Sequence, residues 1–174
     1  MNKKVILIGT GIAACAIAGL VFATKLPATG LLFNHILAVG THSGEINAHA
    51  HVTVPGQEEE GWSAQVETEG ATDFHTTDTA WVQGGTTHWH THPGILLLTL
   101  AADSGPIDWY DSNCQKTVYK AGDSWTEGTS LHDVVVSDPA GAHFLVTYIL
   151  AKGQPRRIDQ EPPACAKGTF LDQP

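Results

Sequence analysis

The sequence predicts an all-β fold built from many short strands, and three observations lead to that prediction. Apolar and polar residues alternate with a period of two in several segments, most clearly in 46–53, and this spacing is typical of a half-buried strand. Turn-forming residues recur at short intervals, with 18 glycines and 9 prolines in the chain. From residue 44 onward there is neither a long amphipathic helical pattern nor an internal repeat. Short strands at close turn spacing indicate a β-sandwich or a β-barrel.

The expected strands follow one another along the chain. Residues 31–37 are apolar and predict either a short helix or an edge strand. Six of the seven residues in 95–101 are apolar, which predicts a strand that is buried on both faces or lines a closed barrel. The other expected strands are 46–53, 62–68, 73–83, 107–110, 117–119, 124–126, 134–136 and 144–150.

Length and composition are those of one globular domain with an appendage. The chain has 174 residues, of which 42% are hydrophobic and 16% charged, a globular rather than a disordered balance. The formal net charge is −9. A chain this acidic repels phosphate backbones, so we expect no nucleic-acid partner. The unusual feature of the composition is the count of ten histidines.

An apolar N-terminal segment predicts export. Lys3 and Lys4 precede a nearly unbroken apolar run over residues 5–23, which is the arrangement of a secretory signal. Residues 21–23 provide a signal-peptidase site, although a run of roughly 20 residues is also long enough to remain as a membrane anchor. A third alternative is lipidation at Cys15, which ends a lipobox-like segment. Each alternative places the body outside the cytoplasm, as a periplasmic, secreted or membrane-anchored protein.

The chain therefore divides into three expected parts. Residues 1–24 are the signal peptide or membrane anchor, 25–43 form a linker, and 44–174 form the domain with its Pro-rich C-terminal tail. The body contains Cys114 and Cys165. Two cysteines in an exported domain favour a disulfide, which would tie the tail to the barrel, and two free thiols are the alternative.

Three histidines stand two residues apart in the segment 84–94. In an extended strand, His88, His90 and His92 would project from the same face. Imidazole is the commonest protein ligand for transition metals, and His132 follows after another turn-rich stretch. We expect these rings to bind one metal ion inside the barrel. The alternative is a surface strip of histidines that binds metal only adventitiously.

Two motifs, in this order, resemble those of the cupin superfamily. The first is a glycine, His-x-His and a closing glycine, and the second is a glycine followed after a loop by a histidine. The matching residues are Gly84 or Gly85, His90, His92 and Gly105 for the first motif, and Gly122 and His132 for the second. The chain is also similar, over residues 44–165, to small exported single-domain bacterial cupins of a type-2-like kind. That similarity is carried by segment 84–94, Tyr110-Asp111 with Cys114, and Arg157-Ile158-Asp159 ahead of Cys165.

The resemblance implies an all-β, jelly-roll-like cupin barrel, preceded here by the N-terminal signal or anchor helix. It also implies that His90, His92 and His132 bind a divalent transition metal, with Fe, Mn, Zn, Ni and Cu not distinguished. The glutamate usual in the first motif is missing after His92. A three-histidine set resembles that of some metal-dependent dioxygenase cupins, and either His88 or Glu127 could supply a fourth ligand.

Two functions are consistent with such a site. The first is a metal-dependent enzyme, oxygenase-like, that acts on a small molecule, for which Glu127, His88 and Tyr119 are the candidate acids or bases. The second is an exported protein that captures a small ligand or the metal without turnover. A barrel that has lost its site and serves only as a scaffold is a third alternative. Cupins often dimerise through edge strands, so a homodimer is a further expectation.

Overall fold

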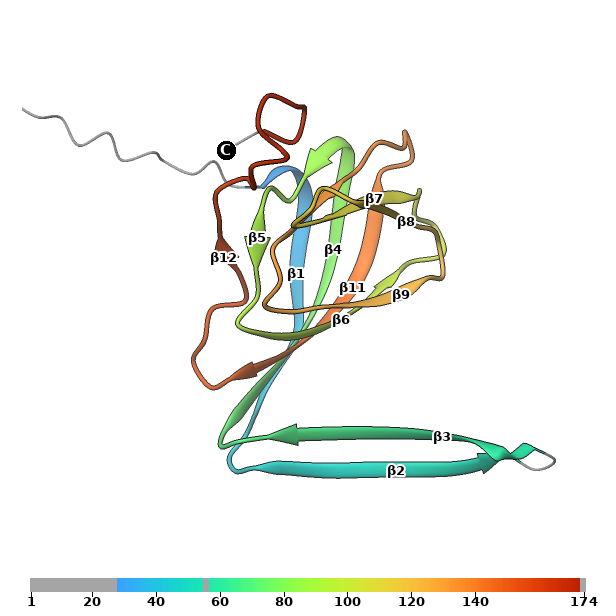
Figure 1. Cartoon of the computed structure of the whole chain (residues 1–174). Helices are drawn as coiled ribbons and strands as arrows, with labels where there is room; N and C mark the ends of the chain where they lie inside the picture. The colour runs from blue at the N-terminus through green and yellow to red at the C-terminus, as the bar shows by residue number, and fades with distance from the viewer. Residues whose placement is uncertain (1–27, 55–56, 173–174) are drawn as a thin grey trace, which may run out of the picture.

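The computed structural model describes residues 28–54 and 57–172, which form a nearly closed β-barrel with a long hairpin arm (Figure 1). The arm consists of β2 (Ile46–Val54) and β3 (Gln57–Thr68). The barrel sheet comprises β1 (Thr29–His42), β4 (Thr72–Thr86), β5 (His90–Thr91), β6 (Gly94–Leu100), β7 (Ile107–Asp111), β8 (Lys116–Tyr119), β9 (Ser124–Glu127), β10 (His132–Val135), β11 (Ala142–Ala151) and β12 (Ile158–Asp159). Within these ranges, no helix is both long and apolar enough to cross a membrane.

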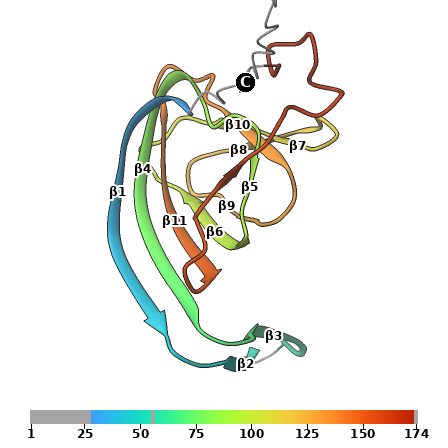
Figure 2. The same cartoon turned by 90° about the vertical axis from the view of Figure 1, so that its left-hand side faces the viewer.

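Strand β4 is central to the barrel because other strands pair with it along both of its edges. Along most of its length it pairs antiparallel with β1 on one edge and β11 on the other. Figure 2 shows these three strands curving together side by side. At its end, Thr86 pairs with Val135 of β10, which in turn pairs with β5 and β7. The sheet thus turns a corner at the start of the histidine segment and wraps around an interior.

Buried and exposed residues alternate along β6 and β11, which pair with one another, and the buried ones form much of the hydrophobic core. In β6, Leu96, Leu98 and Leu100 are buried, whereas Ile95 and Leu97 are exposed. The apolar run of β6 therefore lines a barrel with one face, and the expectation of burial on both faces is wrong. The inward residues of β11 pack against it, among them Phe144, Val146, Tyr148 and Leu150.

The arm is where the structure departs most from the expected domain. Its strands alternate as predicted, but residues 47–53 are exposed on both faces, because no second sheet within the described residues covers the hairpin (Figure 1). Alternation predicts a strand without naming its neighbour. Similarly, β1 occupies most of segment 25–43, which we expected to be a linker, and the edge-strand alternative for 31–37 holds. The expected signal or anchor, 1–24, lies outside the described residues.

The predicted disulfide between Cys114 and Cys165 is confirmed, with the two Cα atoms 6.1 Å apart. It ties the C-terminal tail to the turn between β7 and β8. The tail covers Trp89, which is 1% exposed and donates its indole N–H to the carbonyl oxygen of Leu171 at 2.9 Å. Trp89 therefore packs between the barrel and the tail, in a cluster separate from the main core.

Candidate metal centre

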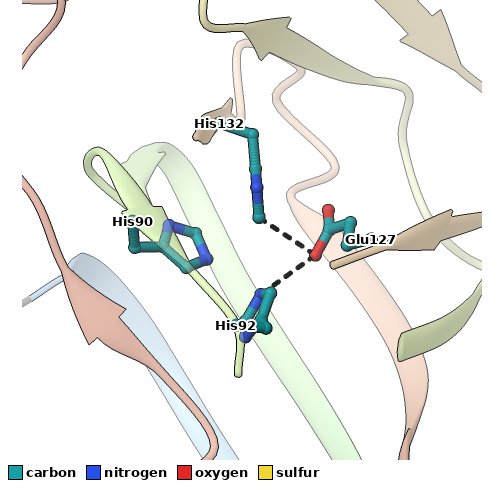
Figure 3. Close-up of side chains that lie close together, drawn as sticks. All are labelled: His90, His92, Glu127 and His132. Carbon is teal, nitrogen blue, oxygen red and sulfur yellow. Dashed lines mark ion pairs between the residues drawn. The ribbon is translucent and has the colours of Figure 1, made fainter. Parts of the chain in front are cut away.

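Four side chains on or beside three strands meet in the barrel interior (Figure 3). His90 begins β5, His92 directly follows β5, Glu127 ends β9, and His132 begins β10. All four are buried, and one ligand atom from each lies within 4.8 Å of the others. In the part of the chain that the structure describes, this is the group that could hold a metal ion.

Strand pairing explains why these residues converge. A period of two places His90 and His92 on the same face of the extended segment that begins with β5. Antiparallel pairing sets His90 opposite His132, since β5 and β10 are neighbours. Glu127 comes from a different strand, β9, which pairs with β6 so that Glu127 lies opposite Leu96. Closure of the sheet thus brings together residues that are up to 42 positions apart in the sequence.

Each of the three imidazoles is oriented by the backbone. The Nδ1 atoms share one kind of partner, a carbonyl oxygen: His90 with His88 at 2.7 Å, His92 with Arg156 at 2.6 Å and His132 with Ser130 at 2.8 Å. Because a carbonyl only accepts, Nδ1 carries the hydrogen and Nε2 keeps its lone pair in a neutral ring. This arrangement fixes the tautomer and the ring plane, as is usual for histidines that bind metal.

Glu127 is held by two indoles. Its Oε1 accepts the N–H groups of Trp109 and Trp125, each at 3.0 Å. Burial raises the pKa of Glu127, but the adjacent His132 and His92 rings more than offset that effect and hold the pKa well below its usual value. Glu127 is therefore a carboxylate whose second oxygen, Oε2, faces the histidines.

Charges also act on the imidazoles. Burial lowers the pKa of His90 well below its usual value, and the neighbouring His132 lowers it further. Burial lowers the pKa of His132 as well, but Glu127 outweighs burial, so the net pKa of His132 is raised. A metal ion and a proton would thus compete for His132 Nε2 next to the carboxylate.

The two distances that join His92 and His132 to Glu127 fit a shared ion better than direct hydrogen bonds. The Nε2 atoms of His92 and His132 lie 3.3 and 3.2 Å from Glu127 Oε2. Charge-assisted hydrogen bonds are shorter, at about 2.7–2.9 Å. Both Nε2 atoms are buried and make no hydrogen bond. Two ligands about 2.1 Å from one ion, separated by 90–110°, would lie about 3.0–3.4 Å apart, as these atoms do.

His88 does not belong to the group, although the sequence placed it on the same face as His90 and His92. Its backbone is left-handed, with φ of 54°, so the extended run is interrupted between the end of β4 and the start of β5. His88 contributes its carbonyl oxygen to His90 instead of its ring. Tyr119, an expected acid or base, stacks on Trp125 with ring centroids 4.4 Å apart and does not line the interior cavity.

A cavity of about 360 Å³ adjoins His90, His92 and Glu127. Much of its wall is apolar and includes Leu96, Leu98, Trp125, Val134, Phe144 and Val146. Its polar lining includes Arg156, Arg157 and Asp159, which follow β11 and lie around β12. The sequence did not place these three residues at the site, and only Arg157 and Asp159 belong to the segment that carries the family resemblance. The alternation in Trp125-Thr126-Glu127, by contrast, could have placed Glu127 on the inner face with Trp125.

No protein-family model and no curated protein matches the sequence. Solved structures are similar in part. The polyketide cyclase RemF from Streptomyces resistomycificus is 16% identical over 57% of this chain and 70% of its own, with a TM-score of 0.43. The DMSP lyase DddQ from Ruegeria pomeroyi is 13% identical over 51% and 44%, with a TM-score of 0.44. A cupin domain from Bordetella pertussis is 19% identical over 63% and 97%, with a TM-score of 0.40.

These TM-scores lie below 0.5, so the chemistry of the site is taken from this chain's own residues. The chain itself shows an all-β, nearly closed barrel with both histidine motifs at one interior site.

Proposed function

We propose that this protein is an exported cupin that holds one divalent transition-metal ion and binds a small molecule beside it. The ligands would be Nε2 of His90, His92 and His132 and Oε2 of Glu127. The observation that carries the proposal is that two buried Nε2 atoms without hydrogen bonds face a buried carboxylate oxygen at 3.2 and 3.3 Å. Buried polar atoms normally have partners, and a metal ion would satisfy both.

The set of donor atoms limits the candidate metal ions but does not single out one of them. Three imidazoles and a carboxylate, with no sulfur, suit Fe, Mn, Zn, Ni and Cu ions. A divalent ion bound there would supply a Lewis acid to a small molecule in the adjoining cavity. The chain's own residues would orient that molecule against the apolar wall and exclude water from most of its surface.

Enzymatic turnover and simple capture remain the two candidate functions, and the acid–base groups favour capture. Glu127 would be a ligand of the ion and so would not be free to act as a base. Tyr148 lines the cavity, but burial raises its pKa, so it stays a neutral phenol that donates a hydrogen bond. An oxygenase-like enzyme would need less from these groups, because the metal would supply most of the chemistry.

Export and self-association complete the proposal. The apolar segment 5–23 and the disulfide both favour an oxidising compartment outside the cytoplasm. The partner we propose for β1 is a second copy of the chain. β1 lies at an edge of the sheet, beside β4, and Leu32, Ile36, Leu37 and Val39 on it are 54–62% exposed. Light scattering should give a dimer mass, and a monomer mass at all concentrations would contradict this part.

Metal content tests the site itself. The mature protein, purified without chelator and dialysed, should contain close to one divalent ion per chain by mass spectrometry of elements. His90→Ala and His132→Ala should each lose it, whereas His49→Ala with His51→Ala on the arm should keep it. A metal-free wild type after exposure to each of the five ions, or equal loss in the arm variant, would contradict the proposal.

A further inference from the structure

The only two arginines in the chain are adjacent in the sequence, and both line the cavity next to the candidate metal centre. Arg156 and Arg157 follow β11, at the point where the chain returns to pair β12 with β5. The other seven basic residues are lysines, and none of the four that the structure describes lines this cavity. The chain thus places all of its guanidinium groups at one site, although its net charge is −9.

Both arginines are fixed to the site by their surroundings. The carbonyl oxygen of Arg156 accepts the Nδ1 hydrogen of His92, and its guanidinium lies 5.7 Å from the centre of the Tyr148 ring. A cation over an aromatic face at this distance is held favourably. The Nε of Arg157 donates to the carboxylate of Asp159, which lies opposite His90 in the pairing of β12 with β5.

Each guanidinium nevertheless keeps one buried nitrogen without a hydrogen-bond partner, Nη1 in Arg156 and Nη2 in Arg157. A guanidinium stays protonated in proteins, so these atoms are always donors. Burying a charged donor without an acceptor is costly, and native proteins normally avoid it. Two such donors on adjacent residues in one cavity indicate a ligand that brings the acceptors.

Charge and shape indicate which ligand. With a divalent ion at the metal centre, the ion and the two guanidinium groups outweigh the carboxylates of Glu127 and Asp159. The cavity would then be positive at its polar end. Much of the remaining lining is apolar, from Leu96, Leu98 and Phe144 among others. Planar guanidinium groups match the two oxygens of a carboxylate, and the apolar wall matches a hydrocarbon body.

We propose that the small molecule bound by this protein is an organic acid with an apolar body, and that Arg156 and Arg157 hold its carboxylate. The apolar body lies against β6 and β11. The proposal deepens the proposed function, since it names the ligand class of the same site. The two arginines are binding residues for the anion, and the ligands of the ion are the separate set described above.

The test compares carboxylic acids with their neutral amides, which differ little in shape. Zinc-loaded protein is titrated by calorimetry with phenylacetate, 3-phenylpropionate and octanoate, and with the matching amides. At least one acid should bind more tightly than its amide by on the order of ten- to a hundredfold, the effect expected for hydrogen bonds to charged groups. Arg156→Met with Arg157→Met should abolish this preference and leave amide binding unchanged.

The controls separate this inference from the metal site. Lys152→Met removes an exposed cation near the arginines and should preserve the preference for acids. Arg157→Lys should keep part of it, because a lysine retains the charge but not the planar fork. Zinc content and near-ultraviolet circular dichroism of every variant should match the wild type, which shows that the barrel and the site are intact.

Two results would overturn the inference. The first is that no acid binds more tightly than its amide to wild-type protein that carries zinc, which would retain the metal site and exclude the anion site. The second is that the double arginine variant keeps the full preference, which would assign the carboxylate to the ion alone. If the wild type takes up no zinc, the proposed metal function fails, and the comparison of acid with amide in that protein still tests the arginines.

Discussion

Two pairs of histidines in this chain have the same spacing and opposite surroundings. His49 and His51 stand two residues apart on β2 of the arm, as do His90 on β5 of the barrel and His92 directly after it. The arm pair is exposed, whereas each barrel histidine is 4% exposed. The sequence motif is therefore the same, and the difference lies in what the sheet brings to it.

Closure of the barrel brings further ligands and orienting groups to its histidine pair, and the described part of the arm has no such groups at its own pair. The barrel adds Glu127 and His132 from two other strands, and backbone carbonyls that orient each ring. In the arm, His49 and His51 lie opposite Gln65 and Ser63 on β3, and neither histidine belongs to the group that could hold a metal. Two imidazoles on a strand thus become a candidate site only where distant strands enclose them.

The largest expected effect comes from replacing a histidine of the barrel pair, whereas the same replacement in the arm pair should have no effect. His92→Ala should weaken zinc affinity by more than about a hundredfold, because even partners that only orient a ligand are worth 10–100-fold. His51→Ala should leave the affinity unchanged. Competition with a zinc-sensitive dye measures both variants. Equal weakening in the two would show that the spacing alone, and not the enclosed site, determines binding.

The second prediction concerns stability, because an ion that binds only the folded barrel must stabilise it. Zinc at about a hundred times its dissociation constant should raise the free energy of unfolding by about 2.7 kcal/mol. A chelator should reverse the gain, and His90→Ala should show none. Calorimetric melting with and without zinc measures this. A gain of the same size in His90→Ala would place the ion elsewhere.

The sequence predicted part of this comparison. The period of two correctly gave strands at both histidine pairs, and the motif spacing correctly singled out the segment with His90 and His92. The sequence pattern could not distinguish a strand of the arm from a strand of the barrel. Alternation indicates which residues share a face of a strand, but it does not indicate which strands lie next to it. The left-handed backbone at His88 is a single-residue event that a period of two does not anticipate.

Glu127 and the arginines show a second limit of the sequence. Glu127 takes the place of the glutamate missing after His92, but it comes from β9, which only the pairing with β6 brings to the site. Arg156 and Arg157 reach the cavity because the chain after β11 returns to β5. Contacts of this kind depend on strand order, which local patterns do not encode.

A smaller effect is expected from the indoles that hold the carboxylate. Trp109→Phe keeps a ring to stack on His132 but removes the N–H that Glu127 Oε1 accepts. Zinc affinity should fall by about tenfold, the lower end of the effect of partners that orient a ligand. Trp62→Phe on the arm, where Trp62 is 57% exposed, is the matched control and should change nothing. A larger loss for Trp62→Phe would connect the arm to the site.

The smallest effect belongs to a third kind of histidine, paired with carboxylates on the barrel surface. Hydrogen bonds to Asp103 and Asp78, at 2.9 and 2.7 Å, raise the pKa of His143. A raised pKa stabilises the fold below the unfolded value near 6.5, and the gain is lost as pH rises through the folded value. Since His143 and its two carboxylate partners are partly exposed, the free energy of unfolding should fall by only a few tenths of a kcal/mol.

Urea unfolding at pH 5.5 and pH 8, on metal-free protein, measures this effect as the difference between wild type and His143→Gln. The wild type should lose more stability than the variant as the pH rises. An equal loss in both would show that His143 does not titrate with a raised pKa.

The most direct test of the enclosed site is a crystal structure of the zinc-loaded protein with an anomalous difference map at the zinc edge. We predict one peak in the barrel, about 2.0–2.2 Å from Nε2 of His90, His92 and His132 and from Oε2 of Glu127. A strong peak at His49 and His51, or an empty barrel in crystals that contain zinc elsewhere, would contradict the account.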